Sequence, residues 1–196
     1  MTDALDRTFA ALRTELGSSG RLTATHADPF FNFVHEPRAT LEVHKRLPRW
    51  RAALEHDGWR PEVRSLREVL WSVIDASGRW DEWLALEEPG RYADANKSVR
   101  DVLGDNKSAP RTRPGLARTL APLLQGDDPR RVLLLTDAAL LHPWLRARTL
   151  ETWFHDAIGG PTVLFYPGRR VGDFGLLFLG VYPEDDTYRS TIVGEP

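Results

Sequence analysis

The sequence predicts an α/β fold with three layers, in which helices flank a mostly parallel central sheet of about five or six strands. The main observation is a pair of apolar runs, residues 131–136 (RVLLLT) and 162–166 (TVLFY), because strands covered on both faces are apolar throughout. Between them, residues 143–158 carry a helical pattern that ends at a glycine pair. A strand, a helix and a strand in this order form a βαβ unit with parallel strands.

The N-terminal half supplies further elements of the same kind. Apolar spacing predicts helices over residues 3–16, 38–57 and from Ser65 onward, and strands over residues 30–35 and 61–66. Pro48 must kink the second helix or start another, because proline lacks the N–H that a helix interior needs. Ser65 can cap the third helix, with Glu68 three residues on as a capping box requires.

The rest of the chain is less regular. Residues 76–113 are expected to form a loosely helical insertion or a mobile loop, followed by a helix over 116–124. We expect Pro167-Gly168 to end the strand before it in a turn, and two more strands to follow at 176–182 and 188–193. Length favours one domain over residues 1–196.

Seven tryptophans are many for this length. Trp50, Trp71 and Trp153 lie on the apolar stripes of predicted helices, so we expect them in the core. Trp80 and Trp83 flank the irregular middle segment. They are expected either to form a satellite core or to anchor a partner.

Composition narrows the function classes. The net charge is −2 and the pI about 6.3, so no global basic field draws the chain to nucleic acid or to an anionic membrane. Cysteine is absent from the sequence, which excludes disulfides, thiolate metal sites and cysteine nucleophiles. The N-terminus is not typical of a secretory signal, and no apolar run is long enough to span a membrane. We therefore expect a cytoplasmic protein.

Candidate binding residues lie where the predicted strands end, because open parallel sheets bind ligands outside the carboxyl ends of their strands. They are His35, Glu36, Arg38, Asp137, Tyr166, Arg169 and Arg170. His35 and Glu36 beside Arg38 are the best metal candidate, although a polar strand-to-helix junction is the favoured interpretation. Arg169 and Arg170 are interpreted as contacts for a protein partner rather than for a phosphate.

Motifs for catalysis are missing from the sequence. Residues 91–98 and 101–108 end in Lys-Ser as a P-loop does, but lack glycine where that motif demands it. Residues 133–137 (LLLTD) resemble a Walker-B strand, a weak signal without a P-loop. HExxH and GxSxG are absent too. The dispersed arginines are matched by acids, so a solvated surface is favoured over a DNA-binding one.

Several segments together resemble the BrxB family of BREX phage-defence systems. They are residues 47–74, residues 131–150, and above all residues 161–180 (PTVLFYPGRRVGDFGLLFLG) with YRSTIV at 188–193. FNFVHEP at residues 31–37 also fits, although family members often have Tyr-Asp where this chain has His35-Glu36. The resemblance covers roughly residues 28–75 and 130–193.

This resemblance implies a cytoplasmic, non-enzymatic interaction or scaffold subunit of a defence assembly, without a cofactor, metal or catalytic residues. Its partners would be a PglZ-type phosphatase-like protein, a DNA methyltransferase or a large ATPase. By analogy the sheet would have a P-loop-ATPase-like topology without the P-loop. Two alternatives stay open: a degenerate nucleotide-binding protein using Asp137 and the strand-end arginines, and a weak DNA-binding accessory subunit.

Overall fold

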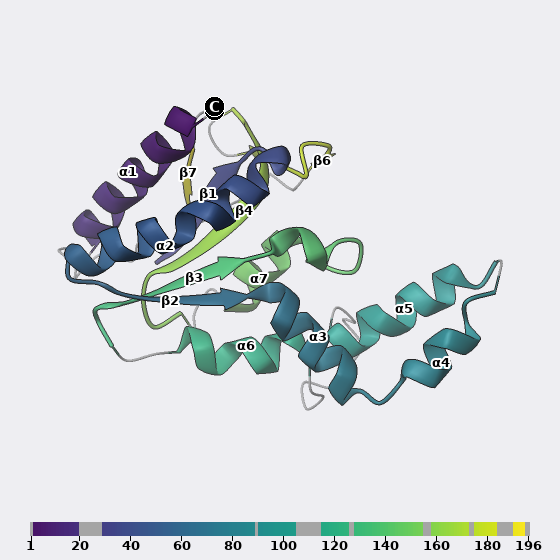
Figure 1. The fold of residues 1–196 in the computed structure, drawn as a ribbon. Helices are drawn as coiled ribbons and strands as arrows, with labels where there is room; N and C mark the ends of the chain where they lie inside the picture. The colour runs from purple at the N-terminus through teal and green to yellow at the C-terminus, as the bar shows by residue number, and fades with distance from the viewer. Residues whose placement is uncertain are drawn as a thin grey trace.

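The computed structural model describes residues 2–19, 29–88, 90–104, 115–125, 128–154, 158–172, 175–183 and 190–194. In these residues a seven-stranded sheet lies between two layers of helices, as Figure 1 shows. The α/β prediction with a mostly parallel central sheet is therefore confirmed. That the whole chain is a single domain stays a prediction.

Five strands form the parallel part of the sheet, in the order β2-β3-β4-β1-β7. Their bounds are β1 Phe30–His35, β2 Arg60–Ser65, β3 Arg131–Thr136, β4 Thr162–Val171 and β7 Thr191–Val193. The apolar strands β3 and β4 are central and buried, as expected, and they pair in parallel across the predicted βαβ unit. Strand β2 is at one edge and carries more polar residues.

Helices α1 (Thr2–Ser19) and α2 (Thr40–His56) cover one face of the sheet. Between α1 and the sheet, the Trp50 ring stacks on Phe9 with centroids 4.8 Å apart. On its sheet side the same ring meets Phe33 at 5.4 Å and Phe165 at 6.1 Å. Pro48 lies inside α2, which continues through it as one helix, so Pro48 does not start a second helix. A short 3₁₀ turn, η1 (Pro37–Ala39), joins β1 to α2.

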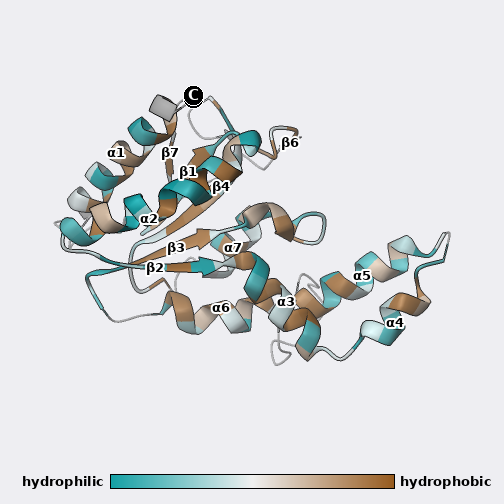
Figure 2. Ribbon diagram, in the orientation of Figure 1, coloured by the Kyte–Doolittle hydropathy of each residue, from teal (hydrophilic) through white to brown (hydrophobic). Residues whose placement is uncertain are grey.

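Helices α3 (Leu66–Ala76), α6 (Leu116–Leu124) and α7 (Ala147–Phe154) cover the other face. Ser65 caps α3 by accepting from the backbone N–H of Glu68, as the sequence predicted. In Figure 2 strands β1, β3 and β4 are predominantly hydrophobic and β2 is partly hydrophilic, whereas the outer helices alternate. The core therefore consists of two apolar layers that share the sheet.

The middle segment is more regular than its sequence suggested. Helices α4 (Trp80–Ala85) and α5 (Tyr92–Leu103) lie beyond α3 and extend away from the sheet in Figure 1. Trp83, Val99 and Leu103 anchor them in the core. The rest of the predicted insertion, residues 105–113, lies outside the described residues.

The prediction that Pro167-Gly168 ends its strand in a turn is wrong. Strand β4 runs through both residues to Val171 and then pairs with the antiparallel strand β5 (Gly175–Phe178). Pro167 has no N–H to donate, but its carbonyl accepts from the Leu179 N–H at 2.8 Å. Gly168 is required by close packing, since a Cβ there would lie 2.3 Å from the Leu177 carbonyl oxygen.

Two element predictions nearby are also wrong in their bounds. The helix expected over 143–158 begins only at Ala147, as α7, after a 3₁₀ turn, η2 (Ala138–Leu141), and further turns at residues 142–144. Residues 155–157 lie outside the described part of the chain. Leu145 lies before α7 and Leu150 lies within it, and both are buried. Buried apolar residues at helical spacing therefore arise here without one long helix. The strand expected over 176–182 is divided into β5 and β6 (Tyr182–Pro183), because residues 179–181 form a turn.

Of the three tryptophans expected in the core, two lie there and one does not. Trp50 is buried and Trp153 packs against the core, as expected. Trp71 is exposed, contrary to expectation, because it lies on the outer side of α3.

Of the strand expected over 188–193, residues 191–193 form β7, and residues 188 and 189 lie outside the described part of the chain.

Candidate functional site at the carboxyl edge of the sheet

Asp137 lies where β3 ends and is held by three side chains. Its carboxylate accepts from Ser65 Oγ at 2.5 Å and from Thr136 Oγ1 at 3.1 Å, and contacts His44 Nε2 at 3.1 Å. The Asp137 backbone is left-handed, with φ 63°, a conformation that Asp adopts more readily than most residues. The carboxylate therefore connects β2, β3 and α2 at this edge, and it does not cap η2.

His35 is the last residue of β1 and is buried on the side of the sheet covered by α1 and α2. Its Nδ1 lies 2.9 Å from the Glu36 carbonyl oxygen. Burial lowers the pKa of His35 below its ordinary value, and the nearby His44 acts in the same direction. The bond to the Glu36 carbonyl opposes this shift. His35 is therefore a neutral histidine at neutral pH.

The side chain of Glu36 points instead to β4, where it pairs with Arg169 at 3.0 Å. Arg38 is exposed on η1, and Arg170 is half-buried, with its Nε donating to the Gly172 carbonyl at 3.1 Å. The charged side chains of Glu36, just after β1, and of Arg169 and Arg170 in β4 therefore lie at one edge of the sheet. The pairing of Glu36 with Arg169 was not predicted, because it depends on the register of two distant strands.

Tyr166 does not reach this surface. Its side chain is 0% exposed on the opposite face of the sheet, where its ring packs edge-on against Phe178 with centroids 5.5 Å apart. A candidate taken from a strand end was in fact part of the core, because β4 continues for five residues beyond it. The remaining candidates lie at or near the edge.

A cavity of about 310 Å³ lies beside these charged groups. Its walls include Thr8 of α1, His35 at the end of β1, Glu36 just after it, and Gly168 to Arg170 of β4. The cavity brings four predicted residues together, and Asp137 is not among its walls. Sequence reasoning missed the contribution of α1, which carries no polar motif at Thr8 that could have indicated it.

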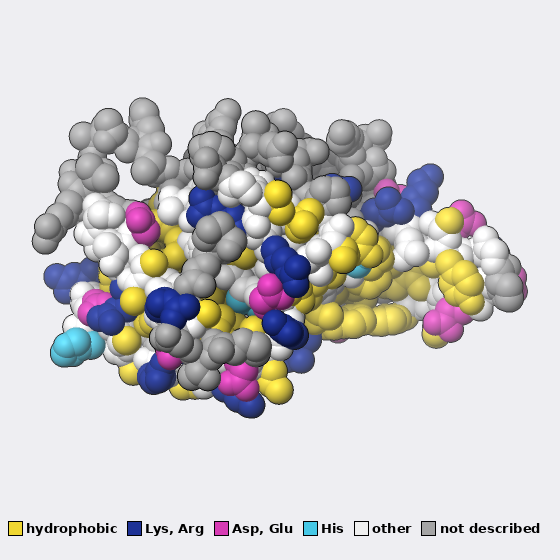
Figure 3. Space-filling model, turned by 90° about the horizontal axis from the view of Figure 1, so that it is seen from above, with side chains coloured by type: hydrophobic (Ala, Val, Ile, Leu, Met, Phe, Trp, Pro, Cys, Tyr) yellow, Lys and Arg dark blue, Asp and Glu magenta, His cyan; other side chains and the backbone are white. Residues whose placement is uncertain are grey.

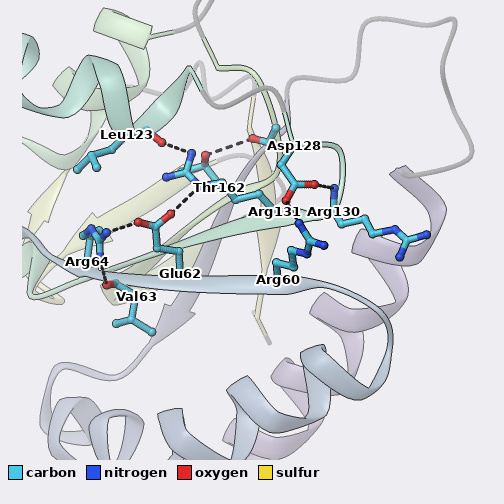
Figure 4. Close-up of polar contacts among 10 residues, drawn as sticks. Arg60, Glu62, Val63, Arg64, Leu123, Asp128, Arg130, Arg131 and Thr162 are labelled. Carbon is cyan, nitrogen blue, oxygen red and sulfur yellow. Dashed lines mark hydrogen bonds and ion pairs between the residues drawn. The ribbon is translucent and has the colours of Figure 1, made fainter.

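The dispersed arginines are mostly engaged with acids, as Figure 4 illustrates for the opposite end of β2 and β3. Arg131 donates to Glu62 at 2.6 Å and also to the Leu123 carbonyl, while Arg64 pairs with Glu62. Arg60 pairs with Asp128 at 3.1 Å. Basic and acidic side chains are likewise interspersed over the face in Figure 3. Arg111 and Arg113 lie outside the described residues.

Two further searches concern only the described part of the chain. Within those ranges no group of three or more histidines and acids is arranged to hold a metal ion. No helix there is long and apolar enough to cross a membrane.

The fold and this edge define a class: a mixed α/β protein whose parallel sheet ends in charged groups that mostly bind one another. The family model described as "BREX protein BrxB" matches residues 63–193, more than half of the chain, and the chain belongs to this family. The match runs through residues 76–113, which the resemblance had left out, and begins after FNFVHEP. Neither the curated proteins nor the solved structures gave a match, so the P-loop-ATPase-like topology stays a prediction.

Proposed function

We propose that this chain is a non-catalytic interaction subunit of a BREX phage-defence system and binds another protein of that system in the cytoplasm. Membership of the BrxB family makes it a BREX component. The partner that we propose is one of the larger BREX proteins: the PglZ-type protein, the methyltransferase or the large ATPase.

The observation that carries a binding role is the exposure of large hydrophobic side chains on the helices beyond the sheet. Trp71, Trp80, Leu84 and Tyr92 are all exposed on α3, α4 and α5. Such side chains are scattered singly on most soluble proteins, whereas grouped ones with polar surroundings typify interaction sites. Tryptophan and tyrosine in particular are enriched among the residues that dominate binding energy.

The carboxyl edge of the sheet supports the same proposal. Glu36 is bound to Arg169, and Asp137, which the nucleotide-binding alternative requires, already accepts from Ser65 and Thr136. We propose that the exposed groups here, Arg38 and Arg169 above all, supplement protein binding through surface contacts. A nucleotide would have to compete with these internal partners.

Co-purification of this chain with each of the other BREX proteins of its own system tests the proposal. One of them is expected to co-elute at micromolar concentrations of both proteins. Arg169→Glu with Arg170→Glu then tests whether the carboxyl edge contributes, by weakening that complex. If the chain elutes alone with every one of them, the proposal is wrong. A thermal shift with ATP and Mg²⁺ would support the nucleotide-binding alternative instead.

A further inference from the structure

Two exposed tryptophans stack on each other at the junction of α3 and α4. The rings of Trp71 and Trp80 have centroids 5.9 Å apart and an interplanar angle of 11°. Their exposed fractions are 43% and 42%, so each ring is covered on one side and open on the other. Leu84, one helical turn after Trp80, is 58% exposed and extends the apolar area along α4.

Contacts of Trp80 and Trp83 with their neighbours hold this stack in place. Trp80 meets the buried Trp83 edge-on at 5.7 Å, and its Nε1 donates to Asp75 Oδ1 at 3.0 Å. Trp83 in turn donates to Ser98 Oγ of α5 at 2.9 Å. Because the indole N–H groups of Trp80 and Trp83 are bound within the chain, the Trp80 ring on which Trp71 stacks is already oriented before any partner arrives. Pre-oriented aromatic rings lose little conformational freedom on binding.

The segment that carries Trp71, Trp80 and Leu84 is acidic. Residues 71–88 contain five acids and a single arginine, a net charge of −4 in a chain whose total is −2. That arginine, Arg79, is bound to Glu82 at 2.6 Å. Among the described residues, the other four acids make no ion pair, and all are exposed: Asp75, Asp81, Glu87 and Glu88. Figure 3 shows acidic side chains beside hydrophobic ones at this end of the molecule.

We infer that this acidic tryptophan surface, formed by Trp71, Trp80, Leu84, Asp75, Asp81 and Glu87, binds a basic segment of a partner protein. Arginine or lysine side chains suit it on two counts: their charge complements the carboxylates, and they interact favourably with the faces of indole rings. The same carboxylates repel nucleic-acid phosphates. The inference rests on the proposed function, because it names the surface and the partner chemistry for that binding.

The test uses the full chain and, as probes, the purified other BREX proteins of the same system. Trp71→Ala is expected to weaken binding of one of them about 30-fold, the effect of losing an interface tryptophan. Asp81→Lys with Glu87→Lys should weaken it at least about tenfold, and raising the salt should weaken the wild-type complex. Carbodiimide should cross-link carboxylates of residues 75–88 to lysines of the partner.

Matched controls lie on α2, on the opposite face of the sheet. Leu41→Ala removes an exposed hydrophobic side chain, and Glu42→Lys reverses an exposed charge. Neither is expected to change the affinity. Circular dichroism and thermal melting of each variant show that a loss of binding does not come from unfolding.

The outcomes separate this inference from the proposed function. If a BREX protein binds wild type and the α3–α4 variants equally well, the inference is wrong while the proposed function holds. If no BREX protein binds the wild type, both are wrong. If the Trp71→Ala change abolishes self-association in sedimentation, the occupant is a second copy of the chain, which overturns the inference. A duplex DNA whose binding depends on Trp71 would overturn it too.

Discussion

Arg169 binds Glu36 through two contacts, Nε to Oε1 at 3.0 Å and Nη2 to Oε2 at 3.3 Å. The two residues are 133 positions apart in the sequence and come together because β1 and β4 pair in parallel. A guanidinium that meets a carboxylate through two hydrogen bonds fixes geometry as well as charge. The pair therefore sets the shape of the cavity wall that both residues line.

The first prediction concerns the stability of this pair. Glu36→Gln and Arg169→Gln should each lower the free energy of unfolding by less than about 1 kcal/mol, because exposed ion pairs gain little over water. The side chains are 38% and 60% exposed. Urea denaturation of both single variants and the double variant gives the coupling energy. The same measurement on the exposed helical pair of Arg51 and Glu55 is the control. A coupling energy above about 2 kcal/mol between Glu36 and Arg169 would contradict the prediction.

The second prediction concerns Asp137, whose carboxylate and left-handed backbone should contribute separately to stability. Asp137→Asn should lower the free energy of unfolding by about 1 kcal/mol, because the amide keeps one acceptor oxygen and tolerates this backbone. Asp137→Ala should lower it by about 2–3 kcal/mol, since it loses both. Urea denaturation measures both changes, with exposed Asp94→Asn as the control. Equal losses for the two variants would show that the backbone conformation contributes nothing.

The sequence predicted those parts of the fold that local pattern determines. Apolar runs identified β3 and β4, and helical spacing identified the helices on both faces. What it missed depends on contacts between distant segments. Whether Pro167-Gly168 is a turn or part of a strand is decided by the pairing with β5, in which Gly168 lies opposite Phe178. The residues Pro167 and Gly168 by themselves are compatible with either structure.

The candidate site, too, could be predicted only in part from the sequence. A parallel sheet predicts that charged residues gather at its carboxyl edge. The structure places His35, Glu36, Arg169 and Arg170 around one cavity there. Which of them pair could not be predicted, because pairing needs the register of β1 against β4. The exposure of Trp71 was missed because an apolar stripe on α3 is wide enough to include a residue at its margin.

The third prediction concerns Gly168, which should not accept even a methyl group. A Cβ there would lie 2.3 Å from the Leu177 carbonyl oxygen and 2.4 Å from the Tyr166 ring. Gly168→Ala should therefore lower the free energy of unfolding by about 1–3 kcal/mol, the range for overpacked sites. Gly17→Ala is the matched control, because nothing lies within 4 Å of a Cβ at Gly17 and α1 should gain stability. Equal urea midpoints for the two variants would contradict the close approach.

The fourth prediction compares one residue type in two environments. Trp50 is 1% exposed between Phe9 and Phe165, so Trp50→Ala should lower the free energy of unfolding by about 3–5 kcal/mol. Trp71→Ala should lower it by less than about 1 kcal/mol, because Trp71 is on the surface. Thermal melting of the two variants under the same conditions measures the difference. A comparable loss for Trp71→Ala would mean that the stack with Trp80 holds α4 in place.

The fifth prediction concerns the pH dependence of stability, which should involve His35. Burial places the pKa of His35 in the folded protein below its value in the unfolded chain. Between the two values the unfolded chain binds a proton that the folded protein does not, so stability falls as the pH falls. The loss of stability begins at about pH 6.5 and grows as the pH falls toward the lower pKa of folded His35. Above this window His35 does not make stability depend on pH.

His35→Asn should remove this dependence while keeping an amide near the Glu36 carbonyl. Urea denaturation from about pH 7.5 to about pH 5 measures it, a range above the ordinary titration of carboxylic acids. Arg13 lowers the pKa of Asp57 further still. His44 is a second histidine near His35 and contacts Asp137, so His44→Gln is the matched control. If His35→Asn loses as much stability at low pH as the wild type while His44→Gln does not, the pH dependence comes from His44 instead.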